Sequence, residues 1–379
     1  PFVEAVRQIS LEVGQENSLF IHVTLVPFLR GSDEHKSKPT QHSVKNLQGL
    51  GIKPDIIVLR ADEKLEESIF RKIALFCNVK PDCVIENMTL PVLYQAPIML
   101  EKSRLSDIVC RELQIEAPAP DMTQWRKMVD RIRHPQGTVR IAMVGKYMQL
   151  HDAYLSVTEA LRHAAYALGR SVHIDYVDSE TINEGNVAEM LGEADGILVP
   201  GGFGERGIEG MIVAARYARE TAKPYLGICL GMQVAVIEFA RHVVGWADAN
   251  SHEFNPNGTH SVVDFMPDQN DEIDKGGTLR LGAYPCMVQP GTTLARCYGA
   301  EQISERHRHR YEFNNLYRDE IRNAGLTLCG VSPDGRLVEA VELSEQPFFV
   351  GVQYHPEFKS RPTHPHPLFL GLISASMKK

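Results

Sequence analysis

One cysteine, Cys229, lies in a pattern that suits a nucleophile. It is the central residue of Gly227-Ile-Cys229-Leu-Gly231, which follows an apolar run expected to be a strand and precedes an expected helix. The glycines permit the sharp turn of a nucleophile elbow. A helix N-terminus favours the thiolate, and the Leu230 amide could donate to an oxyanion. The alternative is a small core residue, the usual fate of a lone cysteine; the two glycines favour the nucleophile.

A candidate general base follows a second expected strand, residues 348–352. The segment Gln353-Tyr354-His355-Pro356-Glu357 places a histidine and a carboxylate two residues apart. If the backbone stays extended through Pro356, both side chains point the same way and Glu357 can orient the imidazole. A histidine beside a proline is also common in loops without catalysis. Together with Cys229, however, the pair predicts a thiol nucleophile, its base and the group that orients the base.

A glycine-rich loop, residues 200–207, nominally matches a dinucleotide-binding fingerprint, because G-x-G-x-x-G runs from Gly202 to Gly207. That interpretation fails about 20 residues further on, where the motif requires an acidic residue and the chain has Gly227-Ile-Cys229. We therefore expect the amides near Gly202 to supply a second oxyanion donor. The remaining alternative is a glycine-rich turn that binds nothing.

The elements that must position these residues form two α/β series. The first has strands at 19–26 and 55–59 with a helix at 40–50 between them, and the second has strands at 139–144, 172–177, 196–199 and 224–228 with a helix at 153–168. Strands that alternate with helices predict mostly parallel sheets. Residues 116–121 and 134–137 are rich in proline and glycine and flank an amphipathic segment at 125–132. We expect two domains, 1–117 and 138–379, joined by a linker at 118–137, and an exposed loop at 255–275.

Composition bounds the class of protein. The 379 residues suggest two or three domains at roughly 150 residues each. The net charge of −8 makes duplex nucleic acid an improbable main partner. Seven cysteines without a CxxC pair, and no apolar run of about 18 residues, predict a cytoplasmic protein with neither a membrane span nor a zinc site. The chain begins at Pro1 inside a helical pattern, so we expect upstream sequence to be missing.

These motifs amount to a family resemblance that spans essentially the whole chain. PGGFG, GICLGMQ and HPE, in this order, resemble class I glutamine amidotransferases, and DANSHEF, GGTLRLG and ERHRHRYE are similar to the CTP synthase family in particular. Residues 36–43 (KSKPTQHS) and 71–79 (RKIALFCNV) resemble nucleotide-binding segments of that family. The resemblance implies part of a P-loop-type amidoligase domain followed by a flavodoxin-like amidotransferase domain.

The resemblance also implies roles for residues of the second domain. Cys229 would attack the carboxamide of glutamine, His355 would shuttle the proton, and Glu357 would orient His355. Without the resemblance, Glu253 would be an ordinary surface acid and residues 306–310 a basic turn. The positions that match glutamine contacts are Gly202, Leu230, Gly231, Met232, Gln233, Glu253 and Arg310.

For the first domain the resemblance implies that ATP phosphorylates the 4-oxygen of UTP and that ammonia displaces the phosphate, a step of pyrimidine nucleotide biosynthesis. The positions that match UTP or CTP contacts are Lys36, Ser37, Lys38, Pro39, Thr40, Gln41 and Lys72. From the residues alone, a lysine-rich loop is more often a solvated surface. Mg²⁺, GTP as allosteric activator, CTP as feedback inhibitor, and assembly into tetramers and filaments are further implications.

The chain departs from the family pattern in one respect. It contains no G-x-x-x-x-G-K-[ST] phosphate loop, which leads us to place the ATP and Mg²⁺ sites upstream of Pro1. On this interpretation the chain alone hydrolyses glutamine but does not make CTP. Two alternatives stay open from the residues: a freestanding glutaminase or amidase, and a non-catalytic regulatory or filament-forming subunit.

Overall fold

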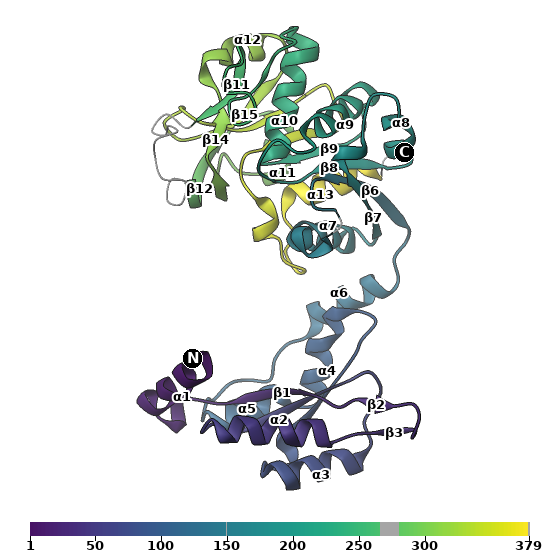
Figure 1. Ribbon diagram of the computed structural model, residues 1–379, viewed down its shortest axis with the longest axis vertical. Helices are drawn as coiled ribbons and strands as arrows, with labels where there is room; N and C mark the ends of the chain where they lie inside the picture. The colour runs from purple at the N-terminus through teal and green to yellow at the C-terminus, as the bar shows by residue number, and fades with distance from the viewer. Residues whose placement is uncertain (149, 266–279, 378–379) are drawn as a thin grey trace. The chain divides into compact units, whose positions relative to one another are not determined.

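A computed structural model describes residues 1–148, 150–265 and 280–377. The chain forms two compact units, residues 1–133 and residues 134–379 (Figure 1). Among the described residues, no helix combines the length and the apolar character that crossing a membrane requires. Each unit is built around its own sheet.

The first unit is a small α/β unit with a parallel sheet of order β1-β4-β5. Apolar residues of β4 are fully buried between helices, which is why its sequence is a nearly continuous apolar run. A short β2–β3 hairpin leads into α2. The elements are α1 (Phe2–Val13), η1 (Gln15–Asn17), β1 (Ile21–Leu25), β2 (Phe28–Leu29), β3 (Glu34–His35), α2 (Lys38–Gly49), β4 (Ile56–Ala61), α3 (Glu67–Cys77), η2 (Pro81–Cys83), β5 (Val84–Met88), η3 (Leu93–Gln95), α4 (Ala96–Lys102), α5 (Leu105–Glu112) and α6 (Thr123–Arg133).

The second unit has a nine-stranded sheet of order β13-β12-β15-β16-β17-β9-β8-β6-β7. The strands from β17 to β7 are parallel, and those from β13 to β16 are antiparallel. Its elements are β6 (Thr138–Gly145), η4 (His151–Tyr154), α7 (Leu155–Ala167), β7 (Ser171–Asp178), η5 (Ser179–Thr181), α8 (Val187–Leu191), β8 (Gly196–Val199), α9 (Ile208–Thr221), β9 (Tyr225–Ile228), α10 (Leu230–Phe239), the π-helix η6 (Ala240–Val244), β10 (Asn250–Ser251), β11 (Ser261–Phe265), β12 (Arg280–Val288), α11 (Thr293–Tyr298), β13 (Gln302–His309), β14 (Tyr311–Phe313), η7 (Asn315–Tyr317), α12 (Arg318–Asn323), β15 (Thr327–Val331), β16 (Val338–Glu342), β17 (Phe349–Val352), η8 (Pro356–Lys359) and α13 (Pro367–Ser376).

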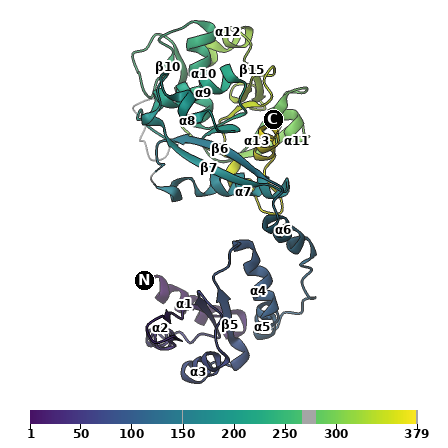
Figure 2. The same ribbon diagram turned by 90° about the vertical axis from the view of Figure 1, so that its right-hand side faces the viewer.

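Helices cover both faces of the parallel strands (Figures 1 and 2). Helices α9 and α10 share one apolar core, while α7 and α13 share another on the opposite face. Strands β8, β9 and β17 are buried along their whole length, as expected for strands covered on two sides. The α/β fold class with mostly parallel sheets is confirmed.

Two expectations about the second half need correction. Residues 261–265, expected to be part of an exposed loop, form strand β11, in which Val262 and Val263 are fully buried; the rest of that expected loop from 266 onward lies outside the described residues. The basic stretch 306–310, which was interpreted as a turn when the resemblance was set aside, lies mostly in β13. There His307 and His309 are buried while Arg306 and Arg308 are exposed, an alternation typical of a strand.

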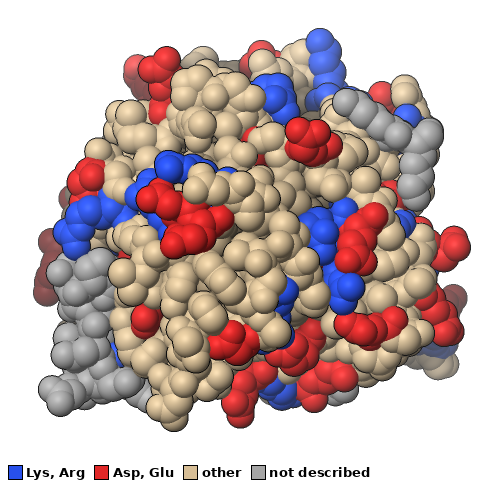
Figure 3. Space-filling model, turned by 90° about the horizontal axis from the view of Figure 1, so that it is seen from above, with Lys and Arg blue, Asp and Glu red and all other residues tan. Residues whose placement is uncertain are grey.

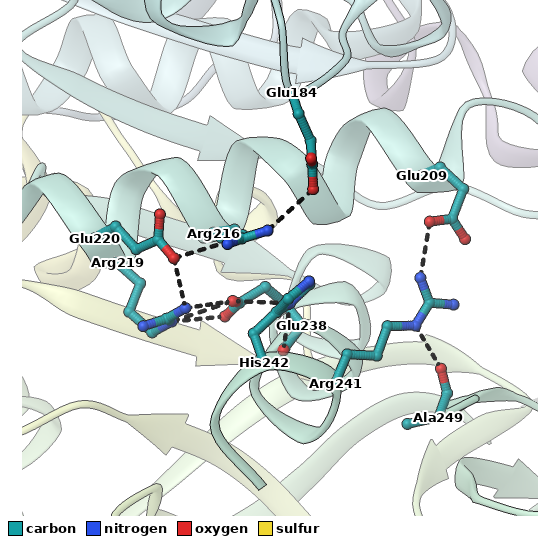
Figure 4. A network of polar contacts seen from close by, with 9 residues as sticks. All are labelled: Glu184, Glu209, Arg216, Arg219, Glu220, Glu238, Arg241, His242 and Ala249. Atoms are coloured by element: carbon teal, nitrogen blue, oxygen red, sulfur yellow. Dashed lines mark hydrogen bonds and ion pairs between the residues drawn. The ribbon is translucent and has the colours of Figure 1, made fainter. Parts of the chain in front are cut away.

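A network of ion pairs joins α9 to the end of α10 (Figure 4). Glu238 is fully buried, and Arg219 donates to its carboxylate at 2.8 Å, with His242 at 3.3 Å from the same oxygen. Surrounding pairs are more exposed: Arg216 with Glu184 and Glu220, and Arg241 with Glu209. On the molecular face of Figure 3, acidic and basic side chains are interspersed.

Candidate active site

Cys229 occupies a strained turn between β9 and α10. Its backbone has φ 53° and ψ −102°, a positive-φ conformation outside the left-handed helical region that is rare for a non-glycine residue. Added Cβ atoms would lie 2.5 Å from the Gly231 carbonyl at Gly227 and 2.1 Å from the Val199 carbonyl oxygen at Gly231. Both glycines are thus required by close backbone packing, and the turn has the strand–turn–helix geometry expected of a nucleophile elbow.

His355 and Glu357 lie at the same edge of the sheet because β17 pairs in parallel with β9, with Val352 opposite Ile228. The Cys229 amide donates to the Val352 carbonyl at 2.7 Å. His355 Nδ1 lies 2.8 Å from Glu357 Oε1, and the two side chains are 13% and 6% exposed. The expected contact is therefore present. The backbone between the two residues is not extended as we expected, because a 3₁₀ turn begins at Pro356.

The surroundings of His355 favour its imidazolium form. Burial lowers the pKa of His355, but the Cys229 sulfur and the Glu357 carboxylate raise it more strongly, to about 10. Within the part of the chain that the structure describes, Nε2 of His355 has no hydrogen bond of ordinary geometry. The ring is held through Nδ1 and leaves Nε2 for proton transfer.

A cavity of about 310 Å³ brings the predicted residues together. Cys229, His355, Glu357 and Gly202 all line it, with aromatic side chains around them. The glycine-rich loop forms one wall. A Cβ at Gly201 would lie 2.9 Å from His355 Cε1 and 3.5 Å from Cys229 Cβ. The loop consequently approaches the nucleophile and the base as closely as backbone can.

Other predicted glutamine contacts do not line that cavity. Leu230 and Met232 are 1% exposed, and their side chains belong to the apolar core, where the Leu230 side chain packs beside Gly202. The first amides of α10 are the donors that a helix N-terminus leaves without intrahelical partners. Gln233 is 5% exposed and donates to the Tyr311 carbonyl at 3.0 Å.

Glu253 lies beside the glycine loop, and Arg310 is close enough to act on its charge. The Gly204 amide donates to Glu253 Oε1 at 2.9 Å. Burial raises the pKa of Glu253, while the Gly204 hydrogen bond, Lys146 and Arg310 partly offset this. Arg310 is 9% exposed and lies 5.2 Å from the centre of the Phe265 ring. A carboxylate and a guanidinium near one loop suit the two charged ends of an amino acid.

Sequence reasoning missed Lys146, which follows β6 directly. Its side chain is 3% exposed, and its Nζ donates to the carbonyls of Phe203 (3.1 Å) and Gly204. Burial lowers the pKa of Lys146 to about 8. This ammonium supports the glycine loop from within the protein. The available signal was a lysine at the end of a continuous apolar strand, where a solvated residue would be unusual.

The predicted UTP residues cluster at the start of α2. Ser37 precedes the helix, Pro39 occupies its first turn, and Gln41 donates to Ser37 Oγ at 3.1 Å. Thr40 is fully buried, and its hydroxyl donates to the Leu25 carbonyl at 3.2 Å, so its side chain holds α2 against β1. Lys38 is exposed.

Two further lysines converge on the hairpin before α2. Lys36 forms an ion pair with Glu34, and Lys72, on α3, also contributes to the low pKa of Glu34, which is caused mainly by the Lys36 hydrogen bond. The structure thus brings Lys36, in the link between β3 and α2, and Lys72, on α3, to one acidic side chain. Compact ammonium groups in this arrangement suit phosphate oxygens.

Only one group of described residues could hold a metal ion: His307, His309 and Glu339. Arg280 donates to Glu339 at 2.6 Å and lies 3.5 Å from His307 Nδ1, which places a cation beside the group. Burial lowers the pKa of His307 to about 2 and that of His309 to about 3. The cluster is thus a buried network of neutral imidazoles, and it lacks the oxygen-rich ligands that Mg²⁺ prefers.

The fold and the site define a class I glutamine amidotransferase unit. Residues 149–375 match the family described as glutamine amidotransferase class-I, and residues 1–115 match CTP synthase N-terminus. The chain belongs to the CTP synthase family, whose members are glutamine-hydrolysing ligases that use ATP and UTP.

Relatives document that assignment over the whole chain. A CTP synthase of Shouchella clausii is 55% identical, covering 97% of this chain and 69% of the relative, and one of Geobacillus kaustophilus is 53% identical, covering 100% and 71%. A solved Trypanosoma brucei CTPS glutaminase domain with bound acivicin is 44% identical, with a TM-score of 0.60, covering 64% of this chain and 94% of that one. These findings support the ligase over a freestanding glutaminase and over a non-catalytic subunit.

Proposed function

We propose that residues 134–379 hydrolyse glutamine with Cys229, His355 and Glu357, and that the ammonia serves the amination of UTP to CTP. The observation that carries the proposal is the convergence of these three side chains on one cavity at the ends of two adjacent parallel strands. Such an arrangement of nucleophile, base and orienting group is the pattern of covalent catalysis.

In the proposed first half-reaction, the Cys229 thiolate attacks the carboxamide carbon of glutamine. The developing oxyanion accepts hydrogen bonds from the amides of Leu230 and Gly202. His355, protonated at Nε2, gives its proton to the departing nitrogen as the C–N bond breaks. Ammonia leaves, and a γ-glutamyl thioester remains on the sulfur.

In the second half-reaction, His355 takes a proton from water, which attacks the thioester carbonyl. The C–S bond breaks, glutamate leaves and the thiolate returns. Glu357 holds Nδ1 throughout and keeps Nε2 directed at the cavity. Glu253 is assigned to the ammonium of the substrate and Arg310 to its carboxylate, with Gly231, Met232 and Gln233 as neighbouring contacts.

For the first unit we propose a UTP or CTP site at the start of α2. Lys36, Lys38 and Lys72 supply positive charge, while Ser37, Pro39, Thr40 and Gln41 shape the turn that presents it. Thr40 contributes through its backbone, since its side chain is buried.

Further properties are extended from the family. They are activation by GTP, inhibition by CTP, a requirement for Mg²⁺, assembly into homotetramers and filaments, and a cytoplasmic location. The described residues form no oxygen-ligand group for Mg²⁺, so no step here is derived through that ion.

A Cys229→Ala substitution tests the proposal. In the full-length enzyme, glutamine-supported CTP formation should disappear while ammonia-supported CTP formation continues. The two rates are measured side by side from the absorbance change as UTP becomes CTP. Equal loss of both rates, in a protein with unchanged thermal unfolding, would refute the role of Cys229.

A further inference from the structure

Gln353 is a fully buried polar residue at the end of β17 to which no role has been assigned above. Its side-chain Nε2 lies 3.6 Å from the Sγ atom of Cys229, within hydrogen-bond range for sulfur. Its backbone amide donates to the Glu339 carbonyl at 2.8 Å, which ties it to β16. A buried amide is thus fixed directly against the nucleophile.

The orientation of this amide follows from its second contact. Gln233 Nε2 donates to Gln353 Oε1 at 3.2 Å and to the Tyr311 carbonyl at 3.0 Å. Because Gln353 Oε1 faces a donor, its Nε2 must face the sulfur. The opposite orientation would bring two NH₂ groups together and point an oxygen at the thiolate.

We propose that Gln353 is a positioning residue for glutamine hydrolysis, which donates a hydrogen bond to the Cys229 thiolate and holds the Gln233 side chain in place. The inference rests on the proposed role of Cys229. A donor that bonds to the charged form of a group favours that form. Hydrogen bonds to ions are roughly twice as strong as neutral ones.

Several side chains around the cavity carry charges or titrate. His355, Glu357 and Arg308 line the same cavity, and Lys146 lies under Gly202. Gln353 neither titrates nor changes charge during the reaction. Its donor is therefore present at every pH. Because this donor favours the thiolate, removing it should shift the pH profile of thiolate formation as well as the rate of glutamine hydrolysis.

Substituting Gln353→Met removes the donor at similar length. Alkylation of Cys229 by iodoacetamide is followed against pH, with the Cys229 peptide quantified by mass spectrometry to separate it from the other cysteines. The pH midpoint should rise by about one unit, as expected for the loss of one hydrogen bond to a charged group. The kcat for glutamine hydrolysis should fall about tenfold, and KM should rise as Gln233 loosens.

Two variants make the result specific. Gln353→Glu keeps the shape but sets a carboxylate against the thiolate, and should raise the midpoint further. Gln346→Met is the matched control, since Gln346 makes a comparable amide contact to the Arg219 carbonyl at 3.0 Å on another part of the unit. It should leave the alkylation profile unchanged.

A wild-type alkylation midpoint in folded Gln353→Met or Gln353→Glu protein overturns the inference. If Gln353→Met does not fold, the alkylation midpoint of Gln353→Glu serves as the test. If neither variant folds, Gln353 is a structural residue and the inference is likewise overturned. This outcome differs from failure of the proposed function, in which Cys229→Ala itself keeps hydrolysing glutamine.

Discussion

Replacing Cys229 with alanine should lower the pKa of His355 sharply. In the native site that pKa is about 10, because the Cys229 sulfur and Glu357 outweigh burial, the largest single influence and the one that lowers it. Once the sulfur is removed, Glu357, at 2.8 Å, is left to oppose burial. We expect a fall of about 2 units or more, equivalent to ~2.7 kcal/mol.

The shift has a predictable effect on stability. A folded-state pKa above the unfolded value of about 6.5 stabilises the protein fully below pH 6.5, and this contribution is lost as pH rises through 10. In the Cys229→Ala variant, this contribution to stability should be lost completely at a lower pH. The wild type should therefore keep a pH-dependent stability between about pH 8 and 10 that the variant largely lacks.

Two measurements check this prediction. The His355 ring is titrated by NMR of histidine-labelled protein, with its signal assigned from a His355→Gln sample. Unfolding in urea is followed by tryptophan fluorescence. The chain has two tryptophans, Trp125 in the first unit and Trp246 in the second, so a Trp125→Phe background leaves a signal from the second unit. Cys329→Ala, at another fully buried cysteine, is the control. A His355 pKa within half a unit of wild type in Cys229→Ala would refute the reasoning.

Two further predictions concern the scaffold. Gly231→Ala should destabilise the second unit by about 3 kcal/mol and abolish glutamine hydrolysis, because its Cβ would lie 2.1 Å from a backbone oxygen of β8 and the turn would have to move; wild-type urea unfolding would contradict this. Glu238→Ala should cost about 3 kcal/mol, since among the described residues Arg219, 18% exposed, then keeps only the 3.4 Å ion pair with Glu220. Glu184→Ala removes a 75% exposed carboxylate of the same network and should lower the free energy of unfolding by less than about 0.5 kcal/mol. Equal losses of stability in Glu238→Ala and Glu184→Ala would contradict the argument that burial of the carboxylate sets its contribution.

The sequence predicted the parallel strands well because their signal is local. Residues 196–199 were expected as a strand and form β8 with those bounds, and the expected strand at 348–352 contains β17. A continuous apolar run can be read without knowing its neighbours. The β13 strand was missed from the residues alone because arginines and histidines suggested a charged turn, although their alternation indicated one buried face.

The site residues show the same difference between local and distant signals. Cys229, His355 and Glu357 were found because each lies in a short motif whose chemistry is evident from the residue types. The roles of Lys146 and Gln353 depend on contacts 57 and 124 residues away along the chain. No local pattern contains such a contact, so only the folded structure could reveal them.

The pairing of β9 with β17 has a consequence for the evolution of the chain. Nucleophile and base are brought together by backbone hydrogen bonds between these two strands, whatever the length of chain that connects them. Insertions and deletions between α10 and β17 can therefore accumulate at surface turns without separating the pair. A single residue inserted within β9 or β17 would instead change which residue leaves the sheet first, and would move one partner away from the other.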